Sequence, residues 1–142
     1  MAKDALVVDS SVVAKWYLVE EGSGAAISIR DEFATGKLDL AVPTLMFYEV
    51  VNALRFSGAF SGVELELAAR SLGKYGFQAW RPRGRFLELA TKMSFESGVT
   101  VYDASYVALA KMRGCKAVTE DRELLERFPG IAVPLSEFNG EG

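Results

Sequence analysis

Four acidic residues stand at positions where a fold of alternating strands and helices would bring them together. Asp9 and Asp121 each follow a short apolar run that reads as a buried strand. Asp103 begins a helical pattern, and Glu49 lies inside a mostly apolar helical stretch. In an open α/β sheet the carboxyl ends of the strands form the ligand crevice. Carboxylates that converge there repel one another unless a cation lies among them, so the spacing predicts a divalent metal site.

Glu49 is the hardest of the four acids to explain without a ligand. Its neighbours one turn away include Leu45, Met46 and Ala53, so its side of the helix is expected to face inward. Burying an unpaired carboxylate lowers the stability of the folded protein by several kcal/mol, on the order of the penalty for a buried ion. Arg55 is six residues further on and points elsewhere, so Glu49 needs a cation, another partner or a proton.

The three aspartates also have a simpler explanation, because each precedes or begins a helix and Asp is a favoured N-cap. Capping and metal binding can coexist at a strand-to-helix junction. Three further polar residues could support the acids: Ser10, Asn52 and Thr119. Asn52 shares a helix face with Glu49, and Thr119 alternates with Asp121 along an extended segment, so its hydroxyl could orient a carboxylate. Ordinary surface or capping roles for these three remain open.

Composition excludes several classes of chemistry. The chain of 142 residues suits one domain, 1–142, and its lack of histidine excludes a Ser-His-Asp triad and a histidine zinc site. A single cysteine, Cys115, forms no internal disulfide, and no apolar run reaches the roughly 18 residues of a membrane span. We therefore expect a cytoplasmic protein without membrane contact. The net charge is −3, but the four acids account for all of it, so a phosphate-bearing substrate is not excluded.

Short apolar segments alternate with helical patterns along the whole chain. This alternation predicts a three-layer α/β/α fold with helices on both faces of a short-stranded, mostly parallel, twisted sheet of about five strands. The expected strands are 6–9, 38–42, 77–80, 116–119 and 131–134. The expected helices are 10–18, 23–35, 43–56, 61–72, 86–97, 103–113 and 122–128.

Four segments, taken in order, resemble the PIN-domain family and, within it, the small VapC-type toxin ribonucleases. They are Val7-Val-Asp-Ser-Ser-Val-Val-Ala-Lys-Trp16, Val42-Pro43 with Glu49-Val-Val-Asn-Ala53, Tyr102-Asp-Ala-Ser-Tyr-Val-Ala-Leu-Ala110 and Val118-Thr-Glu-Asp121. The resemblance implies a PIN-like fold and an endoribonuclease that uses one or two Mg²⁺ or Mn²⁺ ions per site. It also implies a homodimer and a cognate antitoxin that holds the enzyme inactive.

The same resemblance places the four acids, Asp9, Glu49, Asp103 and Asp121, on the catalytic and metal-binding positions of the family, and Thr119 on its Ser/Thr position. The basic residues do not match family positions one by one, so the candidate RNA contacts come from the sequence itself. Arg122 and the basic loop with Arg81, Arg83 and Arg85 are candidate phosphate contacts. Trp16, Tyr17 and Trp80 could stack on bases, although packing roles are also open for them.

Three other functions remain open at this point. The first is phosphotransfer through an Asp9 nucleophile, although Ser11 stands where that chemistry wants a second Asp. The second is a non-catalytic module whose acids bind a basic partner. The third is a PIN-type nuclease of RNA maturation that has no antitoxin.

Overall fold

The computed structural model describes residues 3–138 and contains one five-stranded sheet in which every pair of neighbouring strands is parallel. The strands are β1 (Asp4–Val8), β2 (Leu38–Pro43), β3 (Gln78–Trp80), β4 (Lys116–Thr119) and β5 (Ala132–Pro134). The α-helices are α1 (Ser10–Val13), α2 (Ser23–Ala34), α3 (Leu45–Ser57), α4 (Gly62–Gly73), α5 (Gly84–Ser97), α6 (Val101–Arg113) and α7 (Arg122–Arg127). Two 3₁₀ turns, Ala14–Trp16 and Leu135–Phe138, complete the described elements.

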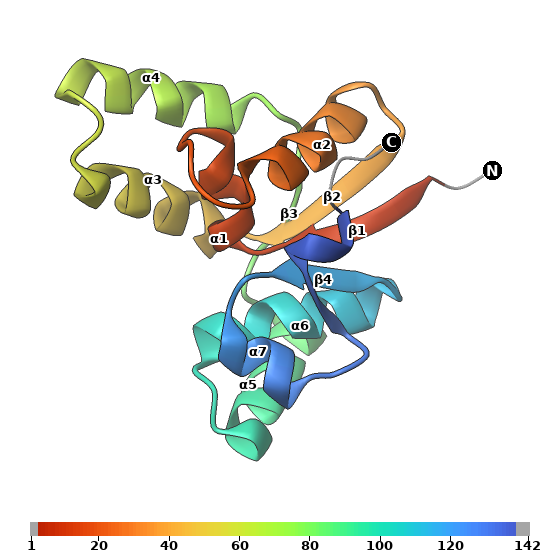
Figure 1. The fold of residues 1–142 in the computed structure, drawn as a ribbon. Helices are drawn as coiled ribbons and strands as arrows, with labels where there is room; N and C mark the ends of the chain where they lie inside the picture. The colour runs from red at the N-terminus through yellow and green to blue at the C-terminus, as the bar shows by residue number, and fades with distance from the viewer. Residues whose placement is uncertain (1–2, 139–142) are drawn as a thin grey trace.

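Helices cover both faces of the sheet, as the sequence predicts. In Figure 1, α1 to α4 lie on one side of the strands and α5 to α7 lie on the other. Helix α6 packs directly on β1, β2 and β4, and α5 packs on the outside of α6. The central residues of the sheet, such as Val7, Leu40 and Val118, are fully buried because helices cover them from both sides.

The strand order is β3-β2-β1-β4-β5, so the chain first builds outward from β1 to β3 and then crosses back to β4. β2 and β3 are added on one side of β1, and β4 and β5 on the other, so the strand order reverses between β1 and β4. In open parallel sheets, ligands bind outside the carboxyl ends of the strands at such a switch point. Because Asp9 follows β1 and Asp121 follows β4, two of the four acids belong to this switch point.

Three helix starts differ by two residues from the sequence prediction: α5 begins at Gly84 instead of residue 86, and α3 and α6 differ for reasons that the hydrogen bonds show. Pro43 does not open α3: it is the last residue of β2, and the N–H of Thr44 donates to the carbonyl of Trp80 over 3.0 Å, which extends the sheet by a residue. Helix α6 begins at Val101, two residues before Asp103, because Thr100 caps it by accepting from the Asp103 N–H.

Candidate active site

Asp9 is the most buried of the four acids, with 7% of its surface exposed. Its backbone stays in the sheet, since its N–H donates to the Val118 carbonyl over 3.0 Å. Its carboxylate Oδ2 accepts hydrogen bonds from the hydroxyls of Thr119 at 2.6 Å and Ser11 at 3.1 Å. Ser10 lies at the limit of a hydrogen bond, 3.4 Å from Oδ1. Asp9 occupies the N-cap position of α1 but makes no side-chain cap, so its carboxylate is directed into the site by hydroxyl groups alone.

Thr119 links two of the acids. Its fully buried hydroxyl donates to Asp9 and accepts from the Asp121 N–H at 3.0 Å. Asp121 in turn caps α7, because its Oδ1 accepts from the Leu124 N–H at 3.0 Å. The hydroxyl therefore fixes the separation of two acids that lie on adjacent strands.

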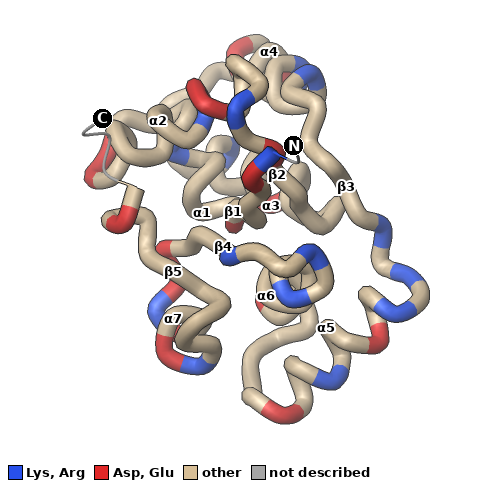
Figure 2. Tube along the Cα trace, turned by 90° about the vertical axis from the view of Figure 1, so that its right-hand side faces the viewer, with Lys and Arg blue, Asp and Glu red and all other residues tan. Residues whose placement is uncertain are grey.

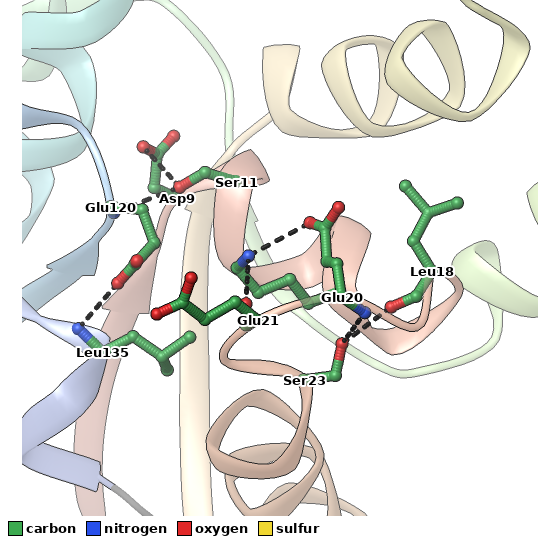
Figure 3. Close-up of polar contacts among 9 residues, drawn as sticks. Asp9, Ser11, Leu18, Glu20, Glu21, Ser23, Glu120 and Leu135 are labelled. Atoms are coloured by element: carbon green, nitrogen blue, oxygen red, sulfur yellow. Dashed lines mark hydrogen bonds and ion pairs between the residues drawn. The ribbon is translucent and has the colours of Figure 1, made fainter. Parts of the chain in front are cut away.

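Ser11 performs a similar linking role on the other side of Asp9 (Figure 3). Its hydroxyl donates to Asp9 and accepts from the backbone N–H of Glu120 at 3.3 Å. The carboxylate of Glu120 turns away from Asp9 and accepts from the Leu135 N–H at 3.1 Å. Glu120 thus ties the C-terminal 3₁₀ turn to the end of β4 and contributes no charge to the site.

Glu49 is half-buried on α3, and its partner comes from the opposite side of the sheet. The hydroxyl of Tyr106, a residue of α6 with 1% exposure, donates to Glu49 Oε1 over 2.5 Å. The sequence analysis did not single out Tyr106 for this role. Tyr106 lies three residues after Asp103, on the same face of α6, and this spacing is the signal that could have identified it.

Helix capping explains the position of one of the three aspartates. Among the three aspartates, Asp121 alone caps a helix with its side chain. Asp103 is half-buried in the first turn of α6, where Thr100 is the cap, so the Asp103 side chain does not serve as the N-cap.

The electrostatics show that the four carboxylates share one region. Burial raises the pKa of Asp9, while hydroxyl donors lower it in part and the charge of Asp121 raises it again. Burial likewise raises the pKa of Glu49; the Tyr106 hydrogen bond opposes this, and the charges of Asp9 and Asp103 add to it. Burial is also the main cause of a raised pKa at Asp103, followed by the charges of Asp121 and Asp9. The charge of Asp121 thus acts on Asp9, while Glu49 and Asp103 each respond to two of the other acids.

The donor set suits a hard divalent cation in an open site. Carboxylate oxygens are the ligands of Mg²⁺ and Mn²⁺, and Mg²⁺ is usually held by one or two carboxylates while it keeps several waters. Within residues 3–138, no group of three or more Asp, Glu, Cys or His side chains is close enough together to hold a metal ion. The acids that could contribute are Asp9, Glu49, Asp103 and Asp121.

The other predicted residues lie in different surroundings. Ser10 is half-buried beside Asp9, whereas Asn52 is exposed and forms no hydrogen bond with Glu49 among the residues described. Arg122 is exposed next to Asp121. The predicted basic loop is shorter than expected, because α5 begins at Gly84 and Arg85 lies in its first turn, after the N-cap Arg83. Arg81, Arg83 and Arg85 line a separate hollow together with Trp80, Phe86 and Met112. Figure 2 shows this run of basic residues between β3 and α5.

Comparison with known proteins agrees with this geometry. The profile of the PIN domain matches residues 6–130. Ribonuclease VapC3 of Pyrobaculum aerophilum is 37% identical over 137 residues, which cover 91% of this chain and 98% of that protein. Exonuclease VapC9 of the same organism is 32% identical over 115 residues, covering 80% of this chain and 86% of that protein. The chain therefore belongs to the PIN-domain family, and the family predicted from the four segments is confirmed.

Solved structures support the same conclusion. The crystal structure of PAE2754 from Pyrobaculum aerophilum has 30% identity and a TM-score of 0.66, and the match covers 96% of this chain and 93% of that one. A toxin–antitoxin complex from Klebsiella pneumoniae contains a chain with 14% identity and a TM-score of 0.67, with 92% and 97% covered, which shows a shared fold. The predicted α/β fold class is confirmed. Across residues 3–138, every helix is too short or too polar to span a membrane.

Proposed function

We propose that this chain is a VapC-type ribonuclease that depends on Mg²⁺ or Mn²⁺ and acts as the toxin of a toxin–antitoxin pair. The observation that carries the proposal is the buried carboxylate of Asp9 at the switch point of the sheet. Two hydroxyl groups hold it in place, and its charge couples to those of the other acids. The 37% identity of this chain to Ribonuclease VapC3, over nearly its whole length, supports RNA as the substrate.

The residues of this site would hold and orient the reacting groups. Asp9, Glu49, Asp103 and Asp121 would bind the cation. When bound, the cation supplies positive charge at the attacked phosphate and makes a bound water more acidic. Thr119 and Ser11 fix the direction of the Asp9 carboxylate, because both donate to its Oδ2, and their hydrogen bonds partly offset the rise in its pKa that burial causes.

The absence of histidine from the sequence predicts the chemistry of the cleaved ends. Ribonucleases that activate the 2′-hydroxyl of RNA commonly use histidine as acid and base. Without it, water is the expected nucleophile and the 3′-oxygen the leaving group, so products should carry a 5′-phosphate and a free 3′-hydroxyl. A substrate with a single 2′-deoxy sugar at the scissile position should still be cut.

End analysis of labelled RNA tests this proposal. Activity should disappear with a chelator and in Asp9→Asn, Glu49→Gln, Asp103→Asn and Asp121→Asn, each of which should remain folded by circular dichroism. Arg70→Gln, an exposed change on α4, is the matched control and should keep full activity. Products with cyclic phosphate ends, or full activity of Asp9→Asn, would refute the mechanism.

The two relatives bear different names, one a ribonuclease and the other an exonuclease, so the mode of attack needs its own experiment. We propose endonucleolytic cleavage. A circular single-stranded RNA has no ends, and only an endonuclease can open it. Cleavage of linear RNA together with resistance of the circle would assign an exonuclease instead.

We propose a cognate antitoxin and a homodimer as partners. Exposed apolar side chains on α3 and α4 offer a surface for association: Tyr48 is 83% exposed, Phe56 73% and Val63 69%. An antitoxin segment that enters the cleft with Arg or Lys would take the place of the cation's charge. Excess Mn²⁺ should then compete with that segment, and light scattering at tens of micromolar tests the dimer.

A further inference from the structure

A small apolar cavity of about 190 Å³ opens beside the acids, and the roles assigned so far do not use it. Its walls come from the start of α3, the loop after β3, α5 and the first turn of α6. The side chains that matter most are Leu45, Trp80, Pro82, Phe86 and Tyr102. This volume is below the roughly 300–1,000 Å³ of pockets for drug-sized ligands, so the cavity suits one planar ring system.

None of the four acids lines the cavity, but residues that do line it are close to two of the acids along α6 and α3. Tyr102 and Ser105, which line it, flank Asp103 within one turn of α6. Leu45 lies one turn before Glu49 on the same side of α3. A ligand group in the cavity would therefore be a near neighbour of the group held by the acids.

On its other side the cavity adjoins the basic loop. Trp80 and Phe86 line both the apolar cavity and the hollow formed by Arg81, Arg83 and Arg85. Among residues 3–138, the salt bridges join Lys3 to Asp39, Lys15 to Glu20 and Arg30 to Asp31, so these three arginines are not neutralised by an acidic neighbour. The cavity thus shares two residues with the arginine hollow and includes residues next to two of the acids in α3 and α6, which would suit a strand whose bases alternate with phosphates.

We propose that the cavity binds one nucleobase of a single-stranded RNA, next to the scissile phosphate, while the arginines bind a neighbouring phosphate. The proposal rests on the proposed function. Tyr102 is 68% exposed at the rim, so its ring is free to stack on a base that enters against Trp80. Trp16 cannot do this, because it is 7% exposed and its indole N–H donates to the Ala26 carbonyl.

The test compares two RNA oligonucleotides of equal charge in the presence of EDTA, where binding is measured without cleavage. One is intact, and the other carries a single abasic nucleotide. A series of such strands moves the abasic nucleotide through every position, so that one of them removes the base that would enter the cavity. The wild-type protein should bind the intact strand at least about five-fold more tightly than the abasic strand at one position. In Tyr102→Ala this difference should vanish, and in Tyr102→Phe, which keeps the ring, it should persist.

Two further variants complete the design. Phe95→Ala removes an exposed ring of α5 that lies outside the cavity, and it should leave the base preference intact. Ala90→Met fills the cavity from α5 and should abolish the preference, with its melting temperature measured as a check on folding. Because Tyr102 is exposed, Tyr102→Ala keeps the test valid if Ala90→Met does not fold.

The possible failures are distinguishable. If the wild type binds and cuts RNA but Tyr102→Ala and Ala90→Met keep the full base preference, the cavity proposal is wrong and the proposed function stands. If these variants change the oligomeric state and leave the base preference intact, a second copy of the chain occupies the cavity and the proposal is also wrong. If the wild type neither binds nor cuts RNA, the proposed function itself fails, and the nucleobase assignment fails with it.

Discussion

Replacing Thr119 by Val should destabilise the metal-free protein by about 2–3 kcal/mol. Valine keeps the shape of the side chain but removes the hydroxyl that donates to Asp9 at 2.6 Å and accepts from the Asp121 N–H at 3.0 Å. A hydrogen bond to a charged group contributes about 1.5–3 kcal/mol. The unpaired N–H of half-buried Asp121 adds about 1 kcal/mol, at the low end for such groups. The extra buried methyl group offsets about 0.8 kcal/mol of this loss.

Urea unfolding at pH 7 in the presence of a chelator measures this difference by linear extrapolation. Thr91→Val is the matched control, because Thr91 is exposed and its hydroxyl donates only to the Leu87 carbonyl within α5. We expect the control to lose no more than about 0.5 kcal/mol. Thr119→Ser keeps a hydroxyl and should recover most of the loss. If Thr119→Val is as stable as Thr91→Val, the hydroxyl does not hold the two acids as described.

Three further predictions concern the acids and their partners. Because burial raises the pKa of Asp9, the folded protein binds more protons than the unfolded chain above about pH 4, so metal-free stability should fall as pH rises through the folded pKa. Asp9→Asn should flatten this dependence in urea titrations between pH 4 and 8, and an unchanged slope would contradict it. Mn²⁺ should raise the melting temperature of the wild type as its concentration rises, because a ligand at 100 times its Kd adds about 2.7 kcal/mol to the free energy of unfolding. Asp9→Asn should reduce this response. A wild-type melting temperature that stays constant up to millimolar Mn²⁺ counts against the site. Tyr106→Phe should lose about 1.5–3 kcal/mol and weaken Mn²⁺ binding in calorimetry, because Glu49 loses its donor, whereas Tyr17→Phe, which loses only a surface hydrogen bond to Ser71, should do neither.

The fold could be predicted from the sequence because the apolar residues of its strands and of its helices follow different patterns. Each predicted strand is present within a few residues, since short apolar runs such as Leu38–Pro43 are buried on both faces and have few alternatives. The misplaced starts of α3 and α6 come from local hydrogen bonds that periodicity does not show. Thr44 is held in the sheet by Trp80, and Thr100 captures the N–H of Asp103, so each helix starts at a residue other than the one its pattern suggests.

The candidate site was predictable only in part. Acids that follow strands must lie at the carboxyl edge of a parallel sheet, so the proximity of Asp9 and Asp121 follows from topology. The donors of Glu49 and Asp9 depend on contacts between distant segments: Tyr106 is 57 residues from Glu49, and Thr119 is 110 residues from Asp9. Thr119 was predicted because it alternates with Asp121. The spacing of Tyr106 from Asp103 places it on the same face of α6, but that spacing does not indicate that its partner is Glu49 on α3.

The kind of donor around the acids carries a further argument about the cation. Among the residues described, no Lys or Arg forms a salt bridge with any of the four acids. The side chains that donate to them are the hydroxyls of Ser10, Ser11, Thr119 and Tyr106. A hydroxyl satisfies and orients a carboxylate oxygen without cancelling its charge, whereas a lysine in the same place would neutralise the site and compete with a metal ion. Charge that is buried, oriented and left uncompensated should destabilise the metal-free protein, and a divalent cation that binds there, as proposed, would recover that free energy.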